Sequence, residues 1–142
     1  MTVYLDTSVL AAYYCPEPSS ERVEVFLTKQ VQPVVSALTE VEFYSAVSRK
    51  VRERALQRKD ATRITSKFMG HLDGRYYSFL PVERHHYRLA RDWIGMFNLP
   101  LRTLDALHLA ICSSEGLDIV TSDPGLLKSA KALSLNAIFI EP

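Results

Sequence analysis

The chain has 142 residues, with 17 Lys and Arg against 16 Asp and Glu, and a formal net charge of +1 at pH 7. This length is typical of one domain with a buried core, and the small net charge argues against a nucleic-acid binder that relies on overall positive charge. Hydrophobic residues make up 47% of the chain and charged residues 23%, which excludes a disordered or fibrous chain. We therefore predict a single globular domain over residues 1–142.

The apolar segments of the sequence are short. No uninterrupted apolar run approaches the length of about 18 residues that crosses a membrane, and Asp6 interrupts the first apolar stretch, so we expect no signal peptide and no membrane partner. Cys15 and Cys112 are far apart and each lies among apolar neighbours, which is typical of small buried side chains rather than of a disulfide or a zinc site. These features predict a cytoplasmic protein.

Short apolar runs alternate along the chain with longer segments of helical periodicity. In chain order, this pattern predicts a strand at 2–5, helices at 8–15 and 20–29, a strand at 33–36, helices at 39–55 and 59–72, a strand at 77–82, helices at 84–97 and 103–114, a strand at 118–121, a helix at 124–133 and a strand at 137–140. Brief, wholly apolar strands are typical of a sheet that is covered on both faces. The alternation therefore predicts an α/β fold with a parallel sheet.

Acidic residues recur where predicted strands end and helices begin. Such junctions meet at the carboxyl edge of a parallel sheet, where ligands bind. The four acids at these junctions are Asp6, Glu42, Asp105 and Asp123. Each also has a structural interpretation: Asp6 and Asp123 as helix N-caps, Glu42 as the partner of Thr39 in a capping box, and Asp105 as a charge that favours a helix N-terminus.

The structural interpretation is weakest for Asp105. Residues 104–112 are apolar nearly all round, so this helix is expected to be buried on most faces, and a buried carboxylate needs a partner. No Lys or Arg follows Asp105 in the helix, although Arg102 just precedes it. We therefore predict a bound cation as the partner of Asp105.

Four converging carboxylates would repel one another strongly. Two unit charges about 4 Å apart repel by roughly 4 kcal/mol at an effective dielectric constant near 20, so such a cluster takes up protons or binds a divalent metal. An all-oxygen ligand set favours Mg²⁺ or Mn²⁺ over zinc. Because such ions promote in-line attack on phosphodiesters, the sequence indicates metal-dependent phosphodiester hydrolysis.

Four segments, in this order, resemble the motifs of the PIN-domain ribonucleases. They are LDTS at 5–8, SALTEVE at 36–42, LRTLDALHLA at 101–110 and VTSD at 120–123, and the compact size is similar to that of VapC-type toxins of toxin–antitoxin modules. The resemblance implies a PIN-like three-layer α/β fold with a mainly parallel central sheet. It also implies a Mg²⁺ site with Mn²⁺ as substitute, hydrolysis of RNA by an endoribonuclease, a homodimer and a cognate antitoxin protein.

The resemblance also assigns roles to individual residues. The acidic quartet of the family, which is catalytic and binds the metal, is matched by Asp6, Glu42, Asp105 and Asp123, with Asp6 and Asp105 as direct ligands. Glu42 is preferred to Glu40 because six positions separate it from Ser36, as in the family motif. Ser8 and Thr121 match the hydroxyl positions near the site and are expected to orient water at the metal.

Two arginines are expected to contact RNA phosphates. Arg49 lies seven positions after Glu42 and therefore on the same helix face, and Arg102 precedes Asp105. A solvated helix face or an antitoxin-binding surface is the alternative for the other basic residues near Arg49. His108 shares a helix face with Asp105, and we predict a packed, hydrogen-bonded histidine beside the site rather than a metal ligand.

The other histidines have no predicted role, and two alternative functions fit the sequence less well. His71, His85 and His86 lack partners at a useful spacing and are given no role. A phospho-acceptor receiver domain would need paired acids after the first strand and a lysine after a late strand, and the sequence has neither. A catalytically silent PIN-fold binding module is the main alternative, and the intact acidic quartet argues against it.

Overall fold

The structure is a computed structural model that describes residues 2–142. One parallel sheet lies at its centre, with the strand order β3-β2-β1-β4-β5. Neighbouring strands are in register at pairs such as Leu5 and Val120 and Ser36 and Leu80. The strands are β1 (Val3–Leu5), β2 (Val34–Ser36), β3 (Ser78–Leu80), β4 (Asp118–Thr121) and β5 (Ala137–Phe139). The predicted parallel sheet is confirmed.

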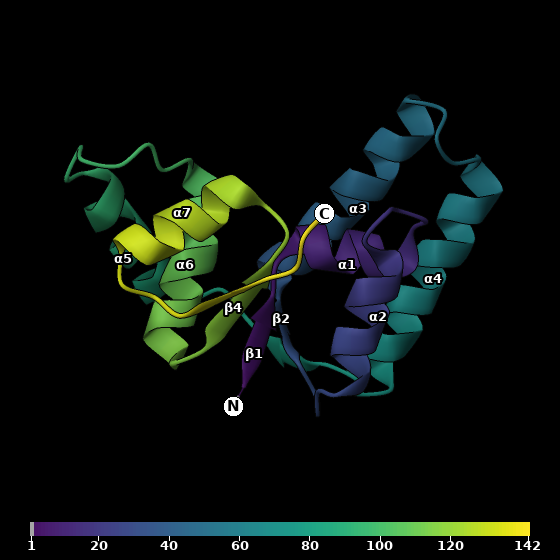
Figure 1. Cartoon of the computed structure of the whole chain (residues 1–142), viewed down its shortest axis with the longest axis horizontal. Coiled ribbons are helices and arrows are strands. Elements are labelled where there is room, and N and C mark those ends of the chain that lie inside the picture. Colours follow the sequence, from purple (N-terminus) through teal and green to yellow (C-terminus); the bar gives the residue numbers. More distant parts are fainter. Residues whose placement is uncertain (1) are drawn as a thin grey trace.

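Helices cover both faces of this sheet (Figure 1). One face carries α1 (Thr7–Tyr14), α2 (Ser20–Thr28), α3 (Ala37–Arg52) and α4 (Arg58–Asp73). The other carries α5 (Arg84–Ile94), α6 (Thr103–Glu115) and α7 (Pro124–Ala132). The predicted three-layer α/β fold is therefore confirmed. None of the helices in the described residues is long and apolar enough to span a membrane.

The apolar strands form the floor of two separate cores. Successive side chains of β1 point to opposite faces, so Val3 and Leu5 pack in the core under α1 to α4, whereas Tyr4 packs in the core under α5 to α7. The same alternation sends Val120 into the first core and Ile119 into the second. Burial on both sides explains why these strands are apolar throughout instead of alternating.

Local capping sets helix boundaries that hydrophobic periodicity misses. Ser36 caps α3: its Oγ accepts from the Thr39 backbone N–H, and the Thr39 hydroxyl oxygen accepts from the Ser36 N–H. The helix therefore begins two residues before the predicted start, and the capping box that paired Thr39 with Glu42 is wrong. The helix predicted at 84–97 ends at Ile94, with Gly95 as its C-cap.

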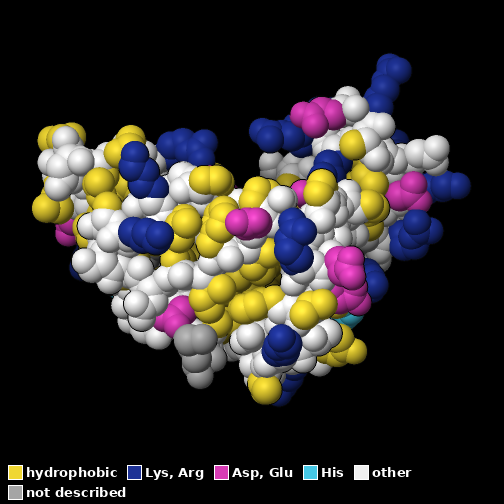
Figure 2. All heavy atoms as spheres, viewed as in Figure 1, with side chains coloured by type: hydrophobic (Ala, Val, Ile, Leu, Met, Phe, Trp, Pro, Cys, Tyr) yellow, Lys and Arg dark blue, Asp and Glu magenta, His cyan; other side chains and the backbone are white. Residues whose placement is uncertain are grey.

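The topology places a ligand-binding crevice beside β1. This strand has β2 on one side and β4 on the other, so the chain reverses its winding direction there, and ligands of open α/β sheets bind outside the carboxyl ends of the strands at that point. Figure 2 shows the molecule hollowed between its two helical layers, with Lys and Arg side chains on both rims. The strands run toward this hollow (Figure 1).

Candidate active site

Asp6 follows β1 directly and occupies the N-cap position of α1, but its side chain makes no capping hydrogen bond. Instead, its Oδ2 accepts from the Ser8 hydroxyl at 2.7 Å and from the Thr121 hydroxyl at 2.9 Å. The residue is only 7% exposed. The other oxygen, Oδ1, lies 3.8 Å from Nε2 of His108. One oxygen of Asp6 is thus held by donors, and the other faces the rest of the site.

Ser8 and Thr121 therefore act on a carboxylate. We expected them to orient water, but in the structure both hydroxyl protons are donated to Asp6. Each hydroxyl oxygen also accepts a backbone N–H, that of Ser122 at Ser8 and that of Asp123 at Thr121, both at 3.0 Å. These bonds join the carboxyl ends of β1 and β4 and fix the orientation of Asp6.

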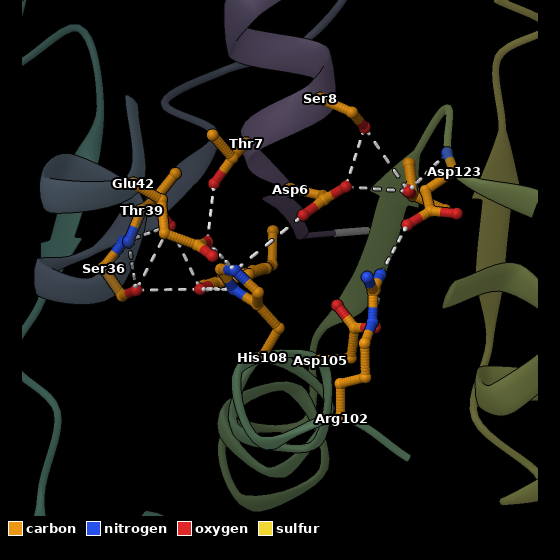
Figure 3. A network of polar contacts seen from close by, with 12 residues as sticks. Asp6, Thr7, Ser8, Ser36, Thr39, Glu42, Arg102, Asp105, His108 and Asp123 are labelled. Carbon is orange, nitrogen blue, oxygen red and sulfur yellow. Dashed lines mark hydrogen bonds and ion pairs between the residues drawn. The ribbon is translucent and has the colours of Figure 1, made fainter. Parts of the chain in front are cut away.

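Glu42 projects from α3 toward the same place (Figure 3). Its Oε1 accepts from the Thr7 hydroxyl at 2.8 Å and from Nε2 of His108. Burial by itself raises the pKa of Glu42, but the hydrogen bond and charge interaction with His108 and the bond from Thr7 outweigh it, so that the pKa is lowered overall. Among residues 2–142, these contacts are made by Glu42 and not by Glu40.

His108 is a packed histidine beside the site, as predicted. It is almost fully buried on α6, and its Nδ1 lies 2.7 Å from the hydroxyl of Tyr4, which also contacts the hydroxyls of Ser36 and Thr39. Nδ1 thus shares a hydrogen bond with Tyr4, and Nε2 carries the proton that faces the Glu42 carboxylate. Burial raises the pKa of Tyr4, which keeps its hydroxyl protonated.

Asp105 has an arginine as its partner. Nε and Nη2 of Arg102 both lie 3.1 Å from Asp105 Oδ2. Burial raises the pKa of Asp105, Arg102 opposes this, and the carboxylates of Asp123 and Asp6 raise the pKa further. Arg102, which just precedes the helix, is thus a side-chain cation for Asp105 in this structure, and a bound metal ion as a further partner stays a prediction. As predicted, the helix is buried on most faces, since every residue from Ala106 to Cys112 is buried, although Leu104 in its first turn is 46% exposed.

Asp123 combines a structural contact with a place in the site. Its Oδ1 accepts from the Gly125 N–H at 2.9 Å and so caps α7, which begins at Pro124. This confirms its interpretation as an N-cap. Its Oδ2 faces Arg102, whose Nη2 is 3.8 Å away. One oxygen holds the helix, and the other remains directed at the site.

The four acids thus converge through shared partners (Figure 3). His108 lies between Asp6 and Glu42, and Arg102 lies between Asp105 and Asp123. The potential ligand atoms are carboxylate oxygens, so the site suits a hard divalent cation such as Mg²⁺.

The quartet is open rather than a tight cage. In the described part of the chain, the residues that bring three potential ligand atoms within 4.8 Å of one another are His85, His86 and Glu115, away from these acids. Mg²⁺ usually retains several waters and binds through one or two carboxylates. An open set of carboxylates therefore fits this ion.

The His85–His86–Glu115 cluster is less suited to a metal. We predicted no role for these histidines, and although His86 Nε2 lies 4.0 Å from Glu115 Oε1, this nitrogen makes no hydrogen bond within residues 2–142. However, His86 Nδ1 accepts the backbone N–H of Glu83 at 2.9 Å, so the ring proton is on Nε2, the atom that would have to bind the metal. A metal-bound histidine normally donates its other ring N–H. We interpret this cluster as a structural histidine–carboxylate contact.

Arg49 lies near the site without being part of the quartet. It is exposed on α3 and lines, with Glu42 and Thr7, a cavity of about 450 Å³. Arg102, the other arginine expected to meet RNA, contacts Asp105 instead in this structure. Both guanidinium groups are therefore at the border of the carboxylate cluster.

Comparison with known proteins identifies the fold. The family model described as "PIN domain" matches residues 3–132. The chain belongs to the PIN domain family. Ribonuclease VapC46 of Mycobacterium tuberculosis is 30% identical over 139 residues, which cover 96% of this PIN domain chain and 95% of that protein.

Solved structures agree with this PIN domain fold. The structure of Mycobacterium tuberculosis VapC20, described as a sarcin-ricin loop cleaving toxin, has a TM-score of 0.73 at 14% identity and covers 99% of this chain and 100% of its own. VapBC-5 from the same organism, a member of the VapBC family of toxin–antitoxin systems, has a TM-score of 0.63 at 19% identity and covers 98% of each chain.

Proposed function

We propose that this PIN domain is a divalent-metal-dependent endoribonuclease and the toxin of a toxin–antitoxin pair. The observation that carries the proposal is the convergence of four carboxylates at the carboxyl ends of β1 and β4, each held by donors from the chain. The ribonuclease activity in the name of VapC46 supports the same chemistry.

In this proposal, Asp6 and Asp105 hold the ion directly, and Asp123 and Glu42 complete the acidic site. When bound, Mg²⁺, or Mn²⁺ as a substitute, supplies an activated water and a positive charge beside the leaving oxygen. Ser8 and Thr121 fix one oxygen of Asp6 so that Oδ1 faces the site. Such preorganisation avoids reorienting the carboxylate during the reaction.

Glu42 is the proton acceptor of the reaction in this proposal. Its pKa is lowered, so it is ionised at neutral pH, and only its Oε1 is occupied by the donors Thr7 and His108. The second oxygen, Oε2, is the atom that takes a proton from the attacking water. Arg49 and Arg102 flank the acids and contact the phosphates of the RNA.

The partners follow from the same relationships. The description of VapBC-5 as a member of a toxin–antitoxin family supports a protein antitoxin as the cognate partner of this chain. Homodimer formation is supported by large apolar side chains that are exposed on and after α5, namely Tyr87, Met96 and Phe97.

The test is cleavage of total RNA by the purified protein with Mg²⁺, with Mn²⁺ or with EDTA. Asp6→Asn is run beside Asp92→Asn, a matched control in which an exposed aspartate paired with Arg91 is changed in the same way. We expect cleavage that requires the metal, is lost in Asp6→Asn and persists in Asp92→Asn. If Asp6→Asn cleaves as fast as the wild type, the proposed site is wrong. If no protein cleaves RNA with either metal, a silent binding module is favoured.

A further inference from the structure

We propose that a cavity on the Asp105 side of the acids is a binding site for one unpaired nucleotide of the RNA, adjacent to the phosphate that is cut. This inference rests on the proposed ribonuclease function. The cavity has a volume of about 270 Å³ and lies between the loop before α6 and the exposed side of α7. Asp105 and Arg102 both line it, so the cavity adjoins the acids.

The position of this cavity makes it part of a path across the active site. The cavity lined by Glu42 and Thr7 lies on the other side of the acids, and Figure 3 shows Glu42 and Arg102 on opposite sides of Asp6. A chain whose phosphate lies at the carboxylates therefore places its neighbouring residues in these two cavities. The Asp105 cavity receives the nucleotide on one side of the cut.

The size of the cavity selects its occupant. A sphere of 270 Å³ is roughly 8 Å across, whereas an α-helix with its side chains measures about 10–12 Å. A helix of a protein partner therefore does not enter, while a single flat base does. RNA is read in this way where bases are unpaired and turned out of the stack, so the substrate is single-stranded or looped at the cut.

The lining matches the chemistry of a nucleotide. Leu99, Pro100 and Ala132 provide apolar surface for the faces of a base, and the half-buried Ser129 provides a hydroxyl for its edge. Lys128 stands at the rim on α7, where its ammonium group meets a phosphate. Arg102 is 77% exposed, and its planar guanidinium stacks on bases as well as binding phosphates. A neutral apolar ligand would make no charge interaction with Lys128 or Arg102, whereas a phosphate would.

Binding is tested without turnover, with ¹⁵N-labelled protein in EDTA and each of the four nucleoside 5′-monophosphates. We expect at least one to shift the backbone amides of Leu99, Ser129 and Ala132 in NMR spectra. Lys128→Ala weakens this binding by about two- to fivefold, and Lys131→Ala, the same change at an exposed lysine on α7 outside the cavity lining, leaves it unchanged. Inorganic phosphate shifts the amides near Lys128 without those of Leu99.

A blocking substitution provides the second measurement. Ala132→Phe adds bulk at an exposed wall position, so the amide spectrum otherwise stays that of the folded protein, and the nucleotide shifts disappear. The base preference beside the cut, mapped by sequencing cleaved total RNA, also changes. Absence of shifts with all four nucleotides, or equal shifts in Ala132→Phe, overturns the nucleotide site. Nucleotide shifts in a protein that cleaves no RNA overturn the proposed function and leave the binding site standing.

Discussion

Replacing Asp105 by Asn distinguishes a metal ligand from a residue that only stabilises a helix. The change removes a charge and preserves the shape of the side chain. Burial and the carboxylates of Asp123 and Asp6 raise the pKa of Asp105, so its ionised form is disfavoured in the folded state, and the substitution relieves this cost. It also removes the ion pair with Arg102, which is worth about 0.2–1 kcal/mol because Arg102 is 77% exposed.

These effects oppose each other in the metal-free protein. We therefore expect the free energy of unfolding of Asp105→Asn in EDTA to lie within about 1 kcal/mol of the wild-type value, with a gain at neutral pH where the repulsion is larger. Metal changes this balance. A free Mg²⁺ concentration one hundred times Kd stabilises the wild type by about 2.7 kcal/mol, which raises Tm by roughly 8 °C in a chain of this size.

The assay is scanning calorimetry of wild type, Asp105→Asn and Asp92→Asn, in EDTA and across a Mg²⁺ series. We expect Asp92→Asn to keep the full Mg²⁺-dependent rise in Tm and Asp105→Asn to lose most of it. A drop of several degrees for Asp105→Asn in EDTA would mean that the carboxylate stabilises α6 itself. A full Mg²⁺ response in that variant would refute its role as a ligand.

Three further predictions concern the groups that hold the acids. Because the pKa of Glu42 is lowered in the folded state, its ionised form stabilises the fold at pH values above the unfolded pKa of 4.5, and this stability is lost as the pH falls through the folded pKa. Glu42→Gln should therefore weaken the dependence of the free energy of unfolding on acidic pH, measured by urea unfolding in EDTA. An unchanged dependence contradicts this prediction. Thr121→Val removes a donor to Asp6 and the acceptor of a backbone N–H, so urea unfolding should show a loss of about 1–3 kcal/mol; a loss within error of zero contradicts these bonds. Arg102→Ala removes a cation that competes for Asp105, and Mn²⁺ affinity by electron paramagnetic resonance titration should rise about two- to fivefold; a lower affinity would show that the arginine supports the metal site.

The succession of strands and helices was predictable because hydrophobic pattern reports burial. Each predicted element is present, and the position of every acid at a junction follows from that succession. The ends of α3 and α5 were missed because they depend on single local contacts. Ser36 caps α3 through its hydroxyl, and Gly95 is the C-cap of α5, neither of which changes the hydrophobic periodicity.

The partners of the acids were harder to predict. Tyr4 lies in an apolar strand and looks like an ordinary core residue, although a buried tyrosine requires a hydrogen-bond partner, and that rule was the available signal. The pairing of Arg102 with Asp105 at a spacing of three residues was also open to prediction. By contrast, the contact of Thr7 with Glu42 joins residues 35 positions apart, and no local sequence pattern predicts it.

The way the acids are held explains how the fold tolerates them without a metal. One oxygen of Asp6 is bound by two hydroxyls, one of Glu42 by Thr7 and His108, and the Asp105 carboxylate by Arg102. Each negative charge therefore has a donor of its own, which offsets part of the mutual repulsion. A structural metal site lacks such donors and unfolds when the metal is removed. In this chain the donors are built into the fold, so a cation at the acids serves the chemistry of the site rather than folding.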